Sequence, residues 1–178
     1  MAKQNKKLDQ SNRVKYGVIG LVVVVLLVGA WFVSNKSKGE EESKGQGAQT
    51  VTLSESGDLV IPIKDISEKA SFYPLEIEGT ALEVLAVKAP DGTIRTAFNT
   101  CQICFSSGRG YYMQDGDLLV CQNCGNRFET KDVEIARGGC NPVPIFAEDK
   151  TVDENNITIS NAFLTEAKGI FENWKNEY

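Results

Sequence analysis

Four of the five cysteines in this 178-residue chain form two C-x2-C pairs, Cys101/Cys104 and Cys121/Cys124, with sixteen residues between the pairs. Cysteines three positions apart can turn both sulfurs to the same side of one tight loop, and two such loops supply four thiolates in a tetrahedral arrangement. We name the pairs hook 1 and hook 2. Their spacing predicts a four-thiolate metal centre at Cys101, Cys104, Cys121 and Cys124.

The identity of the metal decides the class of protein. Zinc is the commonest occupant of paired C-x2-C hooks and would only staple the fold, an iron–sulfur centre would carry electrons, and Cu(I) also prefers thiolates. The chain contains no histidine. This excludes Cys2His2 zinc, Rieske-type and haem histidine ligation, and a Ser-His-Asp triad. The odd number of cysteines argues against a fully paired disulfide scaffold.

The N-terminal region predicts a membrane anchor. Residues 1–15 hold five Lys and Arg against one acid, and residues 16–33 are uncharged and almost wholly apolar. Eighteen helical residues span about 27 Å, close to the hydrocarbon core of about 30 Å. We therefore expect a cytoplasmic basic tail (1–15) and an uncleaved transmembrane signal anchor (16–33), with a cleaved signal peptide as the alternative.

The remainder of the chain is predicted to lie outside the cytoplasm. Residues 34–49 are polar and free of aromatics, which is typical of a flexible linker. From residue 34 onward, 14 Lys and Arg stand against 23 Asp and Glu. So acidic a surface argues against nucleic acid as a partner. In an oxidising compartment cysteines normally pair, so a bound metal would explain why hook thiolates persist in a domain at 50–178.

Short apolar runs separated by turn residues predict a mainly β fold, a small antiparallel barrel or sandwich. Asp91-Gly92 and Asp115-Gly116 are typical hairpin turns. Ser160 is a candidate N-cap of a C-terminal helix, whose apolar stripe would be Phe163, Ala167, Ile170, Phe171 and Trp174. The predicted strands are 59–63, 75–78, 81–88, 93–98, 118–120, 133–136 and 157–160, with 111–114 pairing with 117–120.

The order of the segments is that of a Rieske domain: a strand, hook 1, a β-hairpin, hook 2, and a proline-containing third loop. The ligand set departs from that layout, because every ligand position here is cysteine, and all-thiolate ligation should lower the reduction potential. In hook 2 Gly125 follows Cys124, as in the knuckles of zinc ribbons and rubredoxin-like sites, whereas hook 1 ends Cys104-Phe105 without a glycine. The expected fold is therefore a small Rieske-like or rubredoxin-like β domain.

The segments AFNTCQIC, GRGYY, QDGD, VCQNCGNRF and GGCNPVP, between residues 94 and 144, resemble the FtrD-like membrane iron–sulfur family. The resemblance implies a membrane-attached extracytoplasmic protein that carries an iron–sulfur cluster. We expect a [2Fe–2S] cluster, with a mononuclear iron centre as the alternative. It further implies electron transfer beside a high-affinity iron permease or an ABC-type transport system. By position, Cys101, Cys104, Cys121 and Cys124 take the ligand places, and Cys140 takes a third-loop place in the cofactor site.

Cys140 and the tyrosines after hook 1 are further candidates for a role in the site. In a functional role, Cys140 would cap the cluster, replace a ligand or accept a metal ion. The structural alternative is that Cys140 is a small buried residue beneath a Gly-Pro loop. Tyr111 and Tyr112 should point to opposite sides of a strand, one of them toward the site. Without a histidine or a Ser- or Lys-centred motif, we expect an electron-transfer protein rather than an enzyme with its own substrate.

Overall fold

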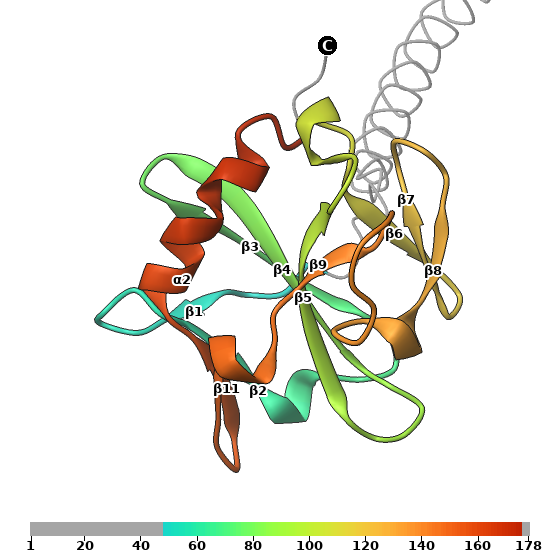
Figure 1. The fold of residues 1–178 in the computed structure, drawn as a ribbon. Helices are drawn as coiled ribbons and strands as arrows, with labels where there is room; N and C mark the ends of the chain where they lie inside the picture. Colours follow the sequence, from blue (N-terminus) through green and yellow to red (C-terminus); the bar gives the residue numbers. More distant parts are fainter. Residues whose placement is uncertain (1–47, 176–178) are drawn as a thin grey trace, which may run out of the picture. The chain divides into compact units, whose positions relative to one another are not determined.

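The computed structural model describes residues 48–175, in which antiparallel strands form three sheets and one short α-helix lies near the C-terminus (Figure 1). The sheet orders are β1-β2-β11-β10, β3-β4-β5-β9 and β6-β7-β8. The mainly β architecture with a C-terminal helix agrees with the prediction from sequence. The strands are β1 (Thr52–Leu53), β2 (Leu59–Pro62), β3 (Ser71–Ile77), β4 (Thr80–Lys88), β5 (Ile94–Cys101), β6 (Tyr112–Asp115), β7 (Leu118–Cys121), β8 (Arg127–Glu129), β9 (Pro142–Pro144), β10 (Thr151–Val152) and β11 (Asn156–Ile159).

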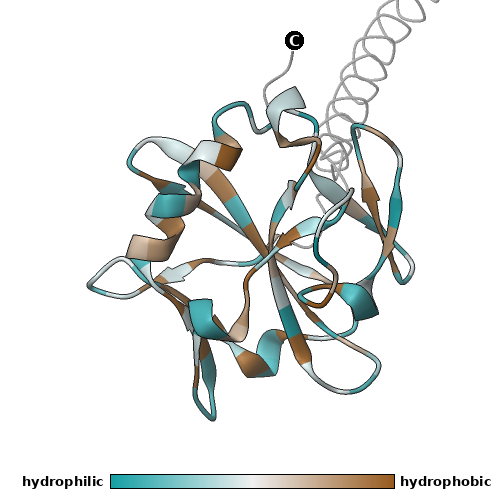
Figure 2. Cartoon of the chain, viewed as in Figure 1, coloured by the Kyte–Doolittle hydropathy of each residue, from teal (hydrophilic) through white to brown (hydrophobic). Residues whose placement is uncertain are grey.

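The central sheet β3-β4-β5-β9 is buried on both faces. Alternate residues of a strand point to opposite faces, and in β4 Val84 and Ala86 pack in one core while Leu85 and Val87 pack in another. We call the second the cysteine-side core, because Cys101, Cys104 and Cys121 belong to it. Hydrophobic residues therefore lie along the central strands, whereas the turns are mostly hydrophilic (Figure 2).

The core on the opposite face is closed by the C-terminal segment. Helix α2 (Asn161–Glu166) continues as a 3-10 helix over Ala167–Phe171, and the Ser160 side chain accepts a hydrogen bond from the Phe163 N–H, which confirms the predicted cap. The ring of Phe98 in β5 lies 5.6 Å from that of Phe163 and 5.7 Å from that of Phe171. This packing fixes β5, the strand that ends at hook 1.

The small sheet β6-β7-β8 carries hook 2. Strands β6 and β7 form a tight hairpin in which Asp115 pairs with Leu118, so Gly116 and Asp117 are the loop residues, one position beyond the predicted turn. Gly116 has a φ of 61°, a conformation that glycine adopts without steric cost. In Figure 1 this sheet lies on one side of the central strands, with α2 and β1-β2-β11 on the other.

The predicted strand at 133–136 is wrong, because these residues form a turn after β8. Glu134 has a φ of 69°, and its carboxylate accepts a hydrogen bond of 2.9 Å from the Thr96 N–H at the edge of β5. The Lys150 ammonium lies 2.5 Å from the same carboxylate, in a largely buried ion pair. This buried ion pair and its hydrogen bonds hold the turn against the sheet. They outweigh the local β propensity of residues 133–136.

No helix within residues 48–175 is both long enough and apolar enough to cross a membrane. The predicted anchor at 16–33, the basic tail and most of the predicted linker lie outside the described residues. They stay predictions from sequence.

Candidate metal centre

Hook 1 begins where β5 ends. Cys101 is the last residue of that strand, and its N–H donates to the Gly110 carbonyl over 2.7 Å. The Ser107 N–H and hydroxyl both donate to the carbonyl of Cys104, over 3.0 and 2.7 Å. Gly110 passes so close that a Cβ built on it would lie 2.6 Å from the Cys104 carbonyl oxygen. The turn therefore needs glycine at position 110, which explains the second glycine of the GRGYY segment.

Hook 2 repeats this placement at the end of β7. Cys121 is the last residue of β7, its N–H donates to the Asn126 carbonyl over 2.9 Å, and the Gly125 N–H donates to the Cys121 carbonyl over 2.8 Å. Gly125 has a φ of 72°, so the left-handed turn predicted after Cys124 is confirmed. Hook 1 instead continues from Cys104 into a short 3-10 helix, so the predicted difference between the hooks is also present.

The two hooks share a hydrogen-bond pattern. In each, the sulfur of the first cysteine accepts from the backbone N–H groups two and three residues later, Ile103 and Cys104 in hook 1 and Asn123 and Cys124 in hook 2. Donors aimed at a sulfur stabilise its thiolate form. Hydrogen bonds to sulfur are also one of the means by which a protein tunes a thiolate-bound iron centre.

A third loop, residues 137–141, lies against both hooks. The Cys140 carbonyl accepts hydrogen bonds from the Tyr112 hydroxyl over 2.8 Å and from the Asn126 amide group over 2.9 Å. The Gly138 N–H donates to the Gln102 side chain within hook 1 over 3.0 Å. Side chains from hook 1, from β6 and from the turn after hook 2 thus hold the loop that carries the fifth cysteine.

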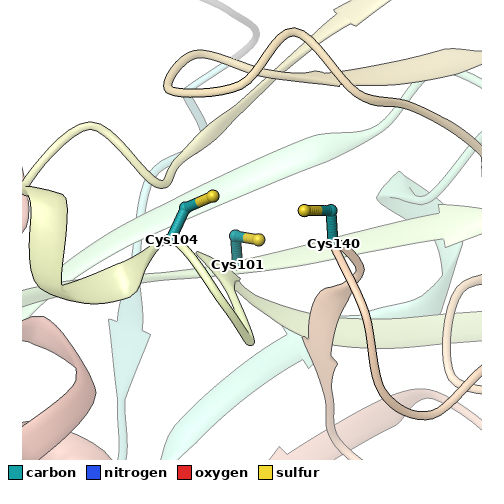
Figure 3. Close-up of side chains that lie close together, drawn as sticks. All are labelled: Cys101, Cys104 and Cys140. Carbon is teal, nitrogen blue, oxygen red and sulfur yellow. The ribbon is translucent and has the colours of Figure 1, made fainter.

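The five cysteines converge, and all five are free thiols. The sulfurs of Cys101, Cys104 and Cys140 lie within 4.8 Å of one another (Figure 3), and so do those of Cys104, Cys121 and Cys124. The Cys124 and Cys140 sulfurs are 3.6 Å apart. Cys104 is common to both triangles, so its sulfur lies within 4.8 Å of all four others and is the hub of the cluster.

Local hydrogen bonds lower the pKa of one thiol in each hook. Burial acts to raise the pKa of Cys101, but hydrogen bonds with the Tyr112 side chain and with two backbone amides outweigh it, and the pKa is lowered. The pKa of Cys124 is lowered chiefly by a hydrogen bond from the Asn126 N–H. Burial, followed by its hydrogen bond with Cys101, raises the pKa of the Tyr112 hydroxyl, which therefore remains a donor.

The other three thiols have raised pKa values. Burial raises the pKa of Cys104, and the Cys101 thiolate adds to the effect. Burial also raises the pKa of Cys121 to about 12, while the hydrogen bond with Cys124 is the main cause that raises the pKa of Cys140 to about 12. Neighbouring thiolates repel one another, so the sulfurs cannot all be ionised unless a cation lies among them. A bound metal would displace the protons of these three thiols.

A buried polar network supports the site from behind. The Tyr112 N–H donates to the Asn99 side chain over 2.8 Å, and the Asn99 amide group donates to the Glu83 carboxylate over 2.6 Å. Glu83 is only 5% exposed, and the Lys175 ammonium lies 3.2 Å from it. The network fixes Tyr112, so the tyrosine that faces the site is the second of the pair, while the Tyr111 ring packs against Trp174.

The two arginines close to the hooks contact groups other than the cysteine sulfurs. The Arg109 guanidinium donates to the Gln122 carbonyl over 3.2 Å, and that of Arg127 pairs with Asp115 over 2.6 Å. Phe128, four residues after Cys124, is buried in the cysteine-side core. The roles of Gly110, Asn126 and Gln102 are not predictable from sequence, because they depend on contacts between segments. The only sequence features that could have pointed to these residues are the amide side chains and glycines within the hooks and just after them.

The donor set suits a thiolate-bound metal. Bonds of about 2.3 Å in a tetrahedral site place sulfurs about 3.8 Å apart, and the sulfurs here form two triangles, each within 4.8 Å, that share Cys104. Cys101, Cys104 and Cys121 are buried, whereas Cys124 is exposed. Soft thiolates with N–H···S hydrogen bonds are the ligands that iron–sulfur clusters, zinc and Cu(I) accept. Cys101, Cys104, Cys121 and Cys124 remain the predicted ligands.

We expect Gly110→Ala to open hook 1, because the added methyl group would collide with backbone atoms of Cys104 that cannot move independently. The bound metal per chain should fall by at least about half, since ligand geometry determines affinity. Gly169→Ala is the matched control, because a Cβ there meets nothing within 4 Å. Metal analysis of both purified variants checks this, and full metal content in Gly110→Ala would contradict it.

In the reduced, metal-free protein, Cys124 should react with iodoacetamide faster than Cys140 at neutral pH. The pKa of Cys124 is lowered and that of Cys140 is about 12, and only the thiolate is nucleophilic. The Cys124 rate should level off once the pH exceeds its lowered pKa, while the Cys140 rate keeps rising into the alkaline range. Peptide mass spectrometry at several pH values measures both, and equal rates at pH 7 would show the assignment to be wrong.

The chain matches one described family. Residues 66–171 match the family model described as membrane iron-sulfur containing protein FtrD-like. No curated protein and no solved structure gives a match. The matched range covers more than half of the chain and contains both hooks, the third loop and the C-terminal helix. With this coverage, the chain belongs to the FtrD-like family of membrane iron–sulfur containing proteins.

Proposed function

We propose that the chain is an extracytoplasmic electron-transfer protein, anchored by residues 16–33, whose hook cysteines hold a [2Fe–2S] cluster. The observation that carries the proposal is the convergence of free cysteine sulfurs around Cys104 in a chain that belongs to a membrane iron–sulfur family. Such a cluster supplies one-electron chemistry. The residues of the chain supply the thiolates, the N–H···S hydrogen bonds and the buried floor of the site.

The arrangement suits electron exchange with a partner protein. Cys101 and Cys121 lie at the ends of strands in the buried core, and Cys124 is exposed at the surface. One edge of the site is therefore shielded from water and the other is open to a partner. The proposed partner is an iron permease or an ABC-type transport system in the same membrane, and the proposed role is delivery of electrons during iron uptake.

Zinc is the alternative that a specific observation favours. The left-handed Gly125 after Cys124 gives hook 2 the backbone of a zinc-ribbon knuckle. In that case the centre would be a structural staple and the domain an interaction module. A Cu(I) centre is the remaining outcome, because the thiolate set would also accept that ion.

Anaerobic purification of the full chain in detergent distinguishes these functions. We expect iron and acid-labile sulfide in the protein, with absorption bands between about 400 and 600 nm that bleach with dithionite. Cys104→Ser should abolish the bands because it removes the hub, whereas Ser106→Ala, at an exposed serine in the same loop, should keep them. A colourless protein with one zinc ion, or one that takes up copper in place of iron, would contradict the proposal.

A further inference from the structure

The site brings together one sulfur more than a four-thiolate centre needs. Cys101, Cys104 and Cys121 are buried, with exposed fractions of 0%, 8% and 1%. Cys124 is exposed and Cys140 is partly exposed, and their sulfurs are 3.6 Å apart at the open edge of the cluster. The surplus sulfur therefore belongs to the outer pair, Cys124 and Cys140.

Cys140 is positioned as closely as the hook cysteines are. Its sulfur lies within 4.8 Å of those of Cys101 and Cys104. Its carbonyl is held by the Tyr112 hydroxyl from β6 and by the Asn126 amide group from the turn between β7 and β8. A cysteine that merely filled space beneath the loop would not need its sulfur so close to the hub.

We propose that Cys124 and Cys140 are alternative fourth ligands of one centre whose permanent ligands are Cys101, Cys104 and Cys121. Asn126 and Tyr112 are positioning residues that keep Cys140 within reach. This inference rests on the proposed function for the kind of centre, but the ligand assignment applies to any thiolate-bound metal.

The geometry makes the exchange a small movement. Two sulfurs bound to the same tetrahedral metal lie about 3.8 Å apart, and the outer pair is already at a comparable separation. In the exchange one metal–sulfur bond breaks and one forms. The departing thiolate takes up a proton and the entering thiol releases one, so the net charge of the site does not change. No oxidant or reductant is required.

Single and double serine variants of the full chain test the assignment. Because both outer cysteines reach the surface, serine fits either position without disturbing the core. Cys124→Ser and Cys140→Ser should each retain at least about two-thirds of the wild-type metal per chain, and the double variant should lose it as Cys104→Ser does, since a centre with three permanent ligands binds weakly. Loss of metal in Cys124→Ser together with full retention in Cys140→Ser would overturn the proposal.

Protection from alkylation provides a second readout. In Cys124→Ser, iodoacetamide should label Cys140 at least about tenfold more slowly in the metal-loaded protein than in the metal-free protein, because a metal-bound thiolate is not available as a nucleophile. In Cys140→Ser the same protection should appear at Cys124. If Cys140 in the Cys124→Ser variant reacts equally fast with and without metal, it is not a ligand and the proposal fails.

The role of Asn126 is tested in the same background. Asn126→Ala removes the side-chain bond to the Cys140 carbonyl but keeps the backbone N–H that bonds to the hook. Added to Cys124→Ser, it should reduce the protection of Cys140, whereas Asn155→Ala, an exposed asparagine in the turn between β10 and β11, should not. Equal protection in both double variants would contradict the positioning role.

These measurements separate the two proposals. If the wild-type chain holds zinc instead of iron, the proposed electron-transfer function fails, while metal retention and protection still decide the ligand assignment. If it holds an iron–sulfur cluster but Cys140 is never protected, the function stands and the exchange is refuted.

Discussion

The close approach of five cysteine sulfurs around Cys104 is the constraint on which the rest of this domain depends. Sulfurs that lie within 4.8 Å of a common neighbour repel one another once they are ionised. The backbone must therefore hold them in place without help from disulfide bonds. It does so by ending β5 and β7 at the first cysteine of each hook and by aiming two N–H groups at that cysteine's sulfur. The surrounding strands provide the rigid support that such a turn needs.

The double-sided central sheet explains how one small domain supports both a core and a metal site. One face of β4 and β5 packs against the C-terminal helix and gives the fold an ordinary apolar core. The other face carries the cysteine-side core together with the buried Glu83–Asn99 pair, whose polar groups are satisfied within the network. Polar groups buried with their partners are specific in geometry, and here they fix Tyr112 beside Cys101. The central sheet therefore positions the residues that surround the metal site.

The part of this architecture that depends on local sequence could be predicted, and the part that depends on contacts between segments could not. The hooks, the turn at Gly125 and the Ser160 cap are set by residues within a few positions of each other, and the structure has them as expected. The turn at Glu134 was mistaken for a strand because its buried partner, Lys150, is sixteen residues away. The position of Cys140 over the hooks, and the need for glycine at position 110, likewise follow from segments that meet only after folding.

The central claim is that the cysteine sulfurs alone bind one inorganic centre. X-ray absorption spectroscopy at the metal edge of the purified full chain tests it most directly, because it reports which atoms surround the metal. The account predicts a first shell that contains only sulfur, at about 2.3 Å as in other thiolate sites. Because the chain has no histidine, nitrogen ligands from imidazole are not possible. A first shell dominated by oxygen or nitrogen would place the metal elsewhere in the chain and contradict the account.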